Sequence, residues 1–358
     1  MSASALRELL LDGLVRVLRA YSPTFEEGEA VAALKDFTED MLGFDEVRVD
    51  RVGNLVASYG DGGRVIAFVG HIDTVPGRIP VEVVGDRVRG RGAVDAKGPL
   101  ISAFVGASMA KELAGNVKVK AVALVGEEGP SHGAWELVRS GERFDHMIIL
   151  EPTGGRDVVI EYRGSASVVV RCVASGGHTS SPELGDSACD KLMRAWGSLR
   201  HELMSMDYVV ALTKLCCGEG GGVLPRRGEL VANLRIPYGK DEGDLHSALA
   251  AIEWPPNCSY SVMGYVPPVR SGVNTAVVRA LFRALIREGV RPSLARKRGT
   301  SDMNILHGRV AAESAAYGPG DPALAHTDAE EISVDELVLG ARVYARTVHE
   351  LSRLGGVK

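Results

Sequence analysis

The chain has 358 residues, of which 45% are hydrophobic and 24% are charged, and its formal net charge is -5. This length exceeds one typical hydrophobic core, so we expect two domains or one domain with a large insertion. The composition is that of a folded protein and excludes disorder, while the negative charge gives no overall attraction to nucleic acid.

The sequence gives no sign of a membrane segment. No apolar run reaches the roughly 18 residues that a membrane span needs, and residues 1–20 alternate charge with leucine instead of forming a signal-peptide core. We therefore expect a cytoplasmic protein without membrane or nucleic-acid partners. The 5 cysteines are odd in number and lack paired spacing. This pattern predicts free thiols, and neither a disulfide framework nor a thiolate zinc site.

The first part of the chain alternates helices with strands. Apolar residues at helical spacing predict two amphipathic helices within residues 6–18 and 30–41. The stretch 21–24 between them is expected to supply a break and a hydroxyl that caps the second helix. The elements expected next are strands at 46–49, 54–58 and 65–69, a helix at 99–113, a strand at 117–125, a helix after 131 and a strand at 146–150. This alternation predicts an α/β sheet covered by helices on both faces.

From about Tyr162 the pattern changes to alternating, β-branched runs. They predict strands at 167–173, 208–215, 229–235 and 259–265, with helices at 186–203 and 241–252 between them. Such a pattern is typical of an α+β insertion with an antiparallel sheet. The chain is then expected to resume with a helix at 273–287 and to end in a long helix that opens with a capping box at Ser333. We therefore expect a catalytic domain formed by 1–161 and 269–358, with an inserted domain at 162–268.

Polar side chains follow the apolar strands of the first part at the point where each strand ends. His71 and Asp73 follow one strand, Glu127 and Glu128 follow the next, and Glu151 follows the third. Open α/β sheets bind their ligands at this carboxyl edge. A glycine-rich loop and a late loop add one carboxylate and one imidazole. The candidate metal ligands are His71, Asp95, Glu128, Glu151 and His326.

Two imidazoles and three carboxylates suit two divalent ions that share one bridging carboxylate. Such a pair of ions activates a water and polarises a carbonyl group. A carboxylate that is not a ligand must accept the proton of the water, and Glu127 is the natural base. Asp73 is expected to bond the far nitrogen of His71 and so fix its tautomer. Each residue alone has an ordinary structural explanation, and it is their joint occurrence that favours a metal site.

The motifs at these positions resemble those of the M20 co-catalytic metallopeptidases, which include carboxypeptidase G2, aminoacylase and acetylornithine deacetylase. They lie at 70–76, 90–98, 126–129 and 151–152, in the order found in that family. The resemblance implies a zinc-peptidase-like sheet sandwiched by helices, with an inserted α+β lid and dimerisation domain. The metals that it implies are two zinc ions, with cobalt as the alternative. The implied ligands are His71 and Glu151 for one ion, Glu128 and His326 for the other, and Asp95 as the bridge.

The resemblance also implies roles for individual residues. Glu127 is the expected general base, Asp73 is the expected orienting residue, and the peptide bond after Asp95 is expected to be cis. His178, in the Gly-Gly-His loop of the insertion, is expected to stabilise the oxyanion. The substrate-binding residues that it implies are Arg235, Thr300 and Ser301, although Asn233 stands where the family has aspartate.

Within the family, the sequences at 93–100, 299–304 and 317–320 resemble hydrolases of a carrier-protein pathway of lysine and arginine biosynthesis. These enzymes cleave the amide between the α-amino group of lysine or ornithine and the γ-carboxyl of the glutamate that ends a small acidic protein, LysW. The resemblance implies the same reaction here, carried out by a homodimer. Basic residues at 226, 227 and 296–298 are candidates for attracting an acidic carrier, and ordinary solvated charge is the other interpretation.

Other functions stay open. The same chemistry would serve an acetylornithine or succinyl-diaminopimelate deacylase or a dipeptidase, none of which needs a surface that docks a protein. A catalytically silent metal-binding relative is the alternative from another class. Glu127, beside an intact set of ligands, argues against that alternative.

Overall fold

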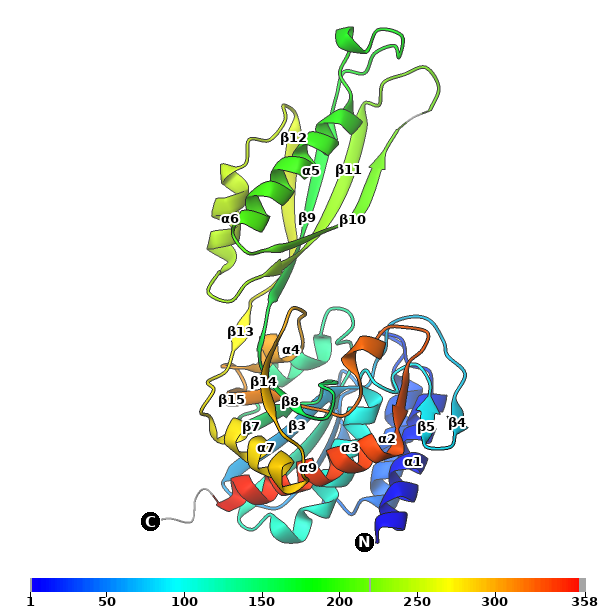
Figure 1. Cartoon of the computed structure of the whole chain (residues 1–358), viewed down its shortest axis with the longest axis vertical. Helices are drawn as coiled ribbons and strands as arrows, with labels where there is room; N and C mark the ends of the chain where they lie inside the picture. Colours follow the sequence, from blue (N-terminus) through cyan, green and yellow to red (C-terminus); the bar gives the residue numbers. More distant parts are fainter. Residues whose placement is uncertain (1, 219, 354–358) are drawn as a thin grey trace. The chain divides into compact units, whose positions relative to one another are not determined.

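The structure is a computed structural model that describes residues 2–218 and 220–353 (Figure 1). The chain divides into two compact units. Unit 1 takes the described residues of 1–160, 271–296 and 301–358, and unit 2 takes those of 161–270 together with the short segment 297–300. No helix of the described residues is long and apolar enough to cross a membrane.

Unit 1 is built on a sheet whose strands run in the order β1-β2-β6-β3-β7-β15-β8. The four strands at its centre pair in parallel, and the outer strands pair antiparallel. Because the central strands are parallel, their carboxyl ends lie along one edge of the sheet. The strands are β1 (Glu46–Val49), β2 (Leu55–Tyr59), β6 (Val117–Leu124), β3 (Arg64–His71), β7 (Phe144–Ile149), β15 (Ala311–Ala316) and β8 (Asp157–Tyr162), and β14 (Ser293–Lys297) pairs with β8.

Helices cover this sheet and share one apolar core with it. The α3 helix packs against β3, β6 and the C-terminal helix α9, and α7 packs against α9, β7 and β15. The capping box of α9 is confirmed, because Ser333 Oγ accepts from the Glu336 N–H and Glu336 accepts from the Ser333 N–H. The predicted α/β fold, with its sheet between helices, is confirmed. The helices are α1 (Ala3–Arg19), α2 (Gly28–Met41), α3 (Lys97–Met109), α4 (His132–Arg139), α7 (Ala276–Arg287), α8 (Met303–Leu306) and α9 (Val334–Ser352).

One expectation at the start of the chain is wrong. No hydroxyl of 21–24 caps α2, because the helix begins at Gly28, its N-cap residue is Glu27, and it has no side-chain cap bond. Thr24 lies too far ahead of the helix, in a turn closed by the Glu26 N–H donating to the Pro23 carbonyl at 2.8 Å. Its hydroxyl is used elsewhere, as described below.

A small sheet of short strands joins two distant parts of unit 1. It runs in the order β16-β5-β4, with β4 at Glu82–Val84, β5 at Arg87–Arg89 and β16 at Glu331–Ser333. The pairing of β16 with β5 is antiparallel and sets Ile332 opposite Val88. It therefore holds the segment after His326 beside the segment that leads to Asp95.

Unit 2 has an antiparallel sheet in the order β10-β11-β9-β12. Alternate residues of β9 and β11, such as Val168 and Leu234, enter a core that α5 (Ala188–Ser205) and α6 (Glu242–Ala251) close on one face. The predicted alternation of buried and outward side chains is thus present in both strands. The strands are β10 (Val209–Cys217), β11 (Arg227–Ile236), β9 (Gly164–Val173) and β12 (Cys258–Val266), and β13 (Val269–Arg270) pairs with the end of β8.

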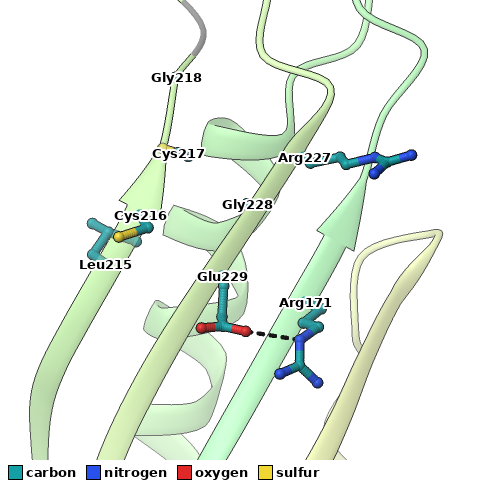
Figure 2. Close-up of a pocket in the computed structure, with 8 residues that line it drawn as sticks. All are labelled: Arg171, Leu215, Cys216, Cys217, Gly218, Arg227, Gly228 and Glu229. Carbon is teal, nitrogen blue, oxygen red and sulfur yellow. Dashed lines mark hydrogen bonds and ion pairs between the residues drawn. The ribbon is translucent and has the colours of Figure 1, made fainter.

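The outward face of this sheet is polar near one end. Figure 2 shows Arg171 of β9 facing Glu229 of β11, the residue directly opposite, at a distance of 2.7 Å between Nε and Oε2. Cys216 lies on the same face opposite Glu229, whereas its neighbour Cys217 points into the unit. These side chains line an open hollow at the end of the sheet.

The prediction of free thiols is wrong for four of the five cysteines. Cys172 is bonded to Cys258, and Cys189 is bonded to Cys217, which leaves Cys216 as an exposed free thiol. The partners are 86 and 28 residues apart, so sequence spacing gave no sign of them. Cys172 and Cys258 are brought together by the register of β9 and β12, in which they are direct partners.

These bonds can be counted chemically. Denatured protein that has not been reduced should react with a thiol reagent once per chain, at Cys216, and 5 times after reduction. Reduction should also lower the stability of unit 2, by about 2–4 kcal/mol for each bond, because the unfolded chain regains conformational freedom. A Cys216→Ser variant is the control and should not react before reduction. Five reactive thiols without reductant would contradict both bonds.

Candidate metal centre and active site

The predicted site residues of unit 1 gather where the parallel strands end. His71 is the last residue of β3, which lies between β6 and β7. Glu127 and Glu128 lie three and four residues after the end of β6, and Glu151 lies two residues after the end of β7. The adjacent parallel strands therefore deliver an imidazole and three carboxylates to one edge of the sheet.

Asp95 lies between two imidazoles. Its Oδ1 is 3.2 Å from His71 Nε2, and its Oδ2 is 3.2 Å from His326 Nε2. His326 Nε2 is also 2.7 Å from Glu128 Oε1. One carboxylate thus turns each of its oxygens toward a different histidine, which is the arrangement that a bridging ligand requires. The Asp95–Ala96 peptide bond is cis, as predicted.

His71 is oriented through its other nitrogen. The buried Nδ1–H donates to the backbone carbonyl of Asp73 at 3.1 Å and lies 3.5 Å from the Asp73 carboxylate. This bond fixes the ring so that Nε2 faces Asp95. In a neutral imidazole bonded in this way Nε2 carries the lone pair, which is the form that binds a metal ion.

The carboxylate of Asp73 holds the turn that carries the two glutamates. Its Oδ1 accepts from the Glu127 N–H and its Oδ2 from the Glu128 N–H, each at 3.0 Å. The hydroxyl of Thr24 donates to Oδ2 at 2.8 Å. Asp73 therefore aligns His71 and the Glu127–Glu128 turn together, and Thr24 serves this alignment instead of capping a helix.

Glu127 lies among other carboxylates. Burial, followed by the nearby charges of Asp302, Glu151 and Glu128, raises the pKa of Glu127, although His71 opposes the rise. Burial also raises the pKa of Asp302 to about 7. A carboxylate with a raised pKa holds a proton more readily, as a general base must when it carries a proton from one atom to another.

The donors present fit divalent metal ions. Among the residues that the structure describes, two groups have ligand atoms within 4.8 Å of one another. One is His71 with Glu127 and Glu128, and the other is Asp95 with Glu128 and His326. Neither group includes Glu151, and the first includes Glu127, the predicted base. Hydrogen bonds to Asp95 and Glu128 raise the pKa of His326 to about 10. A proton between carboxylates marks a position where a cation is favoured, and a metal ion would replace it.

Glu330 is a residue of this site that the sequence did not reveal. It is 1% exposed, and its Oε1 accepts from the N–H groups of Gly92, Val94 and Asp95, each at 3.0 Å. Its Oε2 accepts from Arg91 Nη1 at 3.0 Å. One carboxylate thus shapes the whole loop that presents Asp95. Its position four residues after His326 was the only signal available, and by itself it is weak.

The remaining predicted residues lie in unit 2 or beside the unit boundary. In unit 2, His178 is exposed, its Nδ1 accepts from the Ser180 N–H at 3.1 Å, and Arg235 Nη1 donates to Thr300 Oγ1 at 3.2 Å. Ser301 belongs to unit 1, where its N–H donates to Asn304 Oδ1 at 2.9 Å. The described residues of unit 1 therefore bring the candidate metal ligands together, and the predicted oxyanion and arginine groups belong to unit 2.

Comparisons with known proteins agree with this geometry. A family model described as peptidase family M20/M25/M40 matches residues 67–350. A putative [LysW]-lysine/[LysW]-ornithine hydrolase of Aeropyrum pernix is 40% identical over 336 residues, which are 93% of each chain. A [LysW]-lysine/[LysW]-ornithine hydrolase of Sulfurisphaera tokodaii is 35% identical over 98% of this chain and 97% of its own.

The fold is similar to that of solved peptidase structures. An M20 family metallo-carboxypeptidase from Sulfolobus solfataricus superposes with a TM-score of 0.81 at 18% identity, covering 96% of this chain and 99% of its own. A tripeptidase from Staphylococcus aureus also gives a TM-score of 0.81, at 19% identity, over 97% and 99% of the two chains. At these identities the likeness concerns the fold alone.

The role of Glu330 can be tested by metal binding. Glu330→Ala leaves three backbone N–H groups of the Asp95 loop without their acceptor, so zinc affinity should fall by about 10–100-fold. Titration of the metal-free protein with zinc by calorimetry measures this affinity, and a thermal melt of the same sample checks folding. Glu331→Ala, at the adjacent and more exposed position, should bind zinc as the unmodified protein does. Equal affinity in both variants would contradict the role of Glu330.

Proposed function

Because the chain belongs to peptidase family M20/M25/M40, we propose that it releases lysine, ornithine or both from the C-terminal glutamate of the carrier protein LysW. The chain is a metal-dependent hydrolase that acts on amide bonds. The observation that carries the choice of substrate is the set of relatives named for this reaction, which match nearly the whole chain at 33–40% identity. The reaction belongs to lysine and arginine biosynthesis.

We propose that His71 and Glu151 hold one zinc ion, that Glu128 and His326 hold the other, and that Asp95 bridges them. Cobalt is the alternative metal. The two ions, when bound, supply an activated water and a polarised amide carbonyl. The position of Asp95 between His71 Nε2 and His326 Nε2 supports this assignment. The burial of Glu151 at the end of β7 agrees with its place in the set.

Glu127 is the general base of the proposed reaction. It takes a proton from the attacking water and returns it to the nitrogen of the leaving amino acid, because an amine leaves only once it is protonated. Both steps need the Glu127 carboxyl to lie beside the scissile amide. Asp73 provides this placement, since it binds the N–H of Glu127 and orients His71 at the same time.

His178 of unit 2 is the proposed donor to the oxyanion. Its Nδ1 accepts from the Ser180 N–H, so in the neutral ring the proton lies on Nε2. Nε2 is therefore a hydrogen-bond donor, as stabilisation of a negative oxygen requires. Arg235, Thr300 and Ser301 are the proposed contacts for a substrate carboxylate. The hydrogen bond between Arg235 and Thr300 supports a common role for these two residues.

Unit 2 is also the proposed lid and dimerisation domain. Its edge strand β10 carries exposed apolar residues, among them Val209, Leu212 and Leu215, which a second copy of the chain would cover. Arg227, beside the hollow in Figure 2, is a candidate contact for the acidic carrier. We propose that the reaction takes place in the cytoplasm. Disulfides such as those of unit 2 are rare in that compartment, with the intracellular proteins of hyperthermophiles as the exception.

The base and its neighbour offer a matched pair of variants. Glu127→Gln should retain two zinc ions per chain and lose turnover by at least about 1000-fold, because the amide cannot accept the proton. Glu128→Gln should bind less zinc and also lose turnover, because it removes a proposed metal ligand. Metal content by mass spectrometry and initial rates measure the two effects. Full activity of Glu127→Gln would overturn the assignment of the base.

The substrate can be identified by comparing the rates at which different amides are cleaved. Zinc-loaded protein should release amino acid from LysW-lysine, LysW-ornithine or both, and a chelator should stop the release. N-acetylornithine, succinyl-diaminopimelate and a dipeptide serve as the comparison substrates. Release from the carrier conjugates at the higher kcat/KM supports the proposal, and their ratio gives the preference. Release from the small substrates alone would assign the protein to the deacylases or dipeptidases.

A further inference from the structure

Phe25 combines two features that the stability of unit 1 does not explain. Its backbone is left-handed, with φ at 77°, a conformation that side chains other than glycine rarely adopt. Phe25 is 71% exposed, so burial in the core does not compensate for the backbone strain. Strain kept without a gain in packing points to a functional use of the side chain.

The loop that carries Phe25 is held in place by several bonds. The Phe25 N–H donates to Glu27 Oε1 at 3.0 Å, and Thr24 donates to Asp73 at 2.8 Å. Pro23 forms a bridge with Thr74, whose N–H donates to the Ser22 carbonyl at 2.9 Å. The exposed ring therefore has a fixed position, one residue from the side chain that supports Asp73.

The ring of Phe25 stacks on His132, with centroids 5.6 Å apart and planes inclined by 11°. His132 in turn lies against Gly126, where a Cβ atom would be only 2.2 Å from His132 Nδ1. Gly126 directly precedes Glu127. Phe25 and His132 thus form a stacked pair of rings, which we call the aromatic platform. This pair packs against the turn that carries the proposed base.

We propose that Phe25 is a specificity-determining residue, and that the side chain of the leaving lysine or ornithine lies on the aromatic platform. This inference rests on the proposed function, because Glu127 must protonate the leaving nitrogen and the leaving amino acid therefore lies on the side of Glu127. A lysine or ornithine side chain has an aliphatic stem and an ammonium group. An exposed aromatic face attracts both, through apolar contact and through a cation–π interaction.

The test compares a long cationic leaving group with a short one. The probes are γ-glutamyl-lysine and γ-glutamyl-alanine, given to zinc-loaded wild-type protein, Phe25→Gly and Val84→Ala. Val84 is 72% exposed on β4 and serves as the matched control for loss of an exposed apolar side chain. Binding of free lysine by calorimetry, and the melting temperature, are measured on the same three proteins.

Phe25→Gly should lower kcat/KM for γ-glutamyl-lysine by about 10-fold, mainly through KM, and change the alanine probe by less than about twofold. It should change the melting temperature little, because relief of the left-handed backbone strain offsets the loss of the stack on His132. Val84→Ala should leave both probes unchanged. An unchanged ratio of the two probes in Phe25→Gly would overturn the inference, and so would a loss of stability that accounts for the change.

Lysine binding separates this inference from the proposed function. If wild-type protein cleaves no carrier or γ-glutamyl substrate, the proposed function fails. The aromatic platform still stands if Phe25→Gly raises the Kd for free lysine by about 10-fold. An equal Kd in wild type and Phe25→Gly, or no binding of lysine to either, would overturn the platform whatever the hydrolysis assays give.

Discussion

The structure of unit 1 depends on how it offsets the repulsion between carboxylates that lie close together at the ends of the parallel strands. Neighbouring negative charges repel strongly when water is excluded, so each carboxylate needs a partner that offsets its charge or a raised pKa that keeps it protonated. Asp73 is compensated by backbone N–H groups and Asp95 by two imidazoles, whereas Glu127 and Asp302 respond with a raised pKa. Divalent cations between these groups would remove most of the remaining repulsion. The arrangement therefore fits the divalent ions that the proposed function needs. The carboxylates are Asp73, Asp95, Glu127, Glu128, Glu151 and Asp302.

Two buried carboxylates, Asp73 and Glu330, position the residues of the candidate site without a proposed contact to substrate. Asp73 links Thr24, His71 and the Glu127–Glu128 turn, and Glu330 links Arg91 to the loop of Asp95. Each ties together segments that are far apart in the chain, through charge-assisted bonds to backbone N–H groups. Such bonds are directional, and removal of the carboxylate leaves these N–H groups without their acceptor. The positions of the proposed ligands are in this way tied to the backbone, so a small displacement of either loop would move several of them together.

The parts of the fold that sequence predicted are those with a periodic signal. The strand at Glu46–Val49 has the predicted bounds, and the residues at the ends of β3, β6 and β7 follow from the rule that parallel strands share an edge. The parts that it missed arise from pairing between distant segments. Glu330 reaches the Asp95 loop because β16 pairs with β5, and strands of three residues leave no periodic pattern. Likewise, Cys172 meets Cys258 through the register of β9 and β12, which an odd number of unevenly spaced cysteines does not reveal.

The two units have different roles in the proposed reaction: unit 1 binds the metal ions, and unit 2 supplies the oxyanion donor and the arginine. All the proposed metal ligands belong to unit 1, so metal affinity is expected to be a property of that unit. In unit 2, the donor nitrogen of His178 is set by Ser180 and the side chain of Arg235 by Thr300, both within the unit. The segment 297–300 belongs to unit 2 although its chain neighbours belong to unit 1, which keeps Thr300 with Arg235. Two disulfides further restrict the unfolded states of unit 2. Each unit therefore presents prearranged groups, and the cost of ordering them is met in folding and not when the substrate binds. A change in unit 2 should then alter turnover without altering metal affinity, whereas a change at Glu330 should alter metal affinity first.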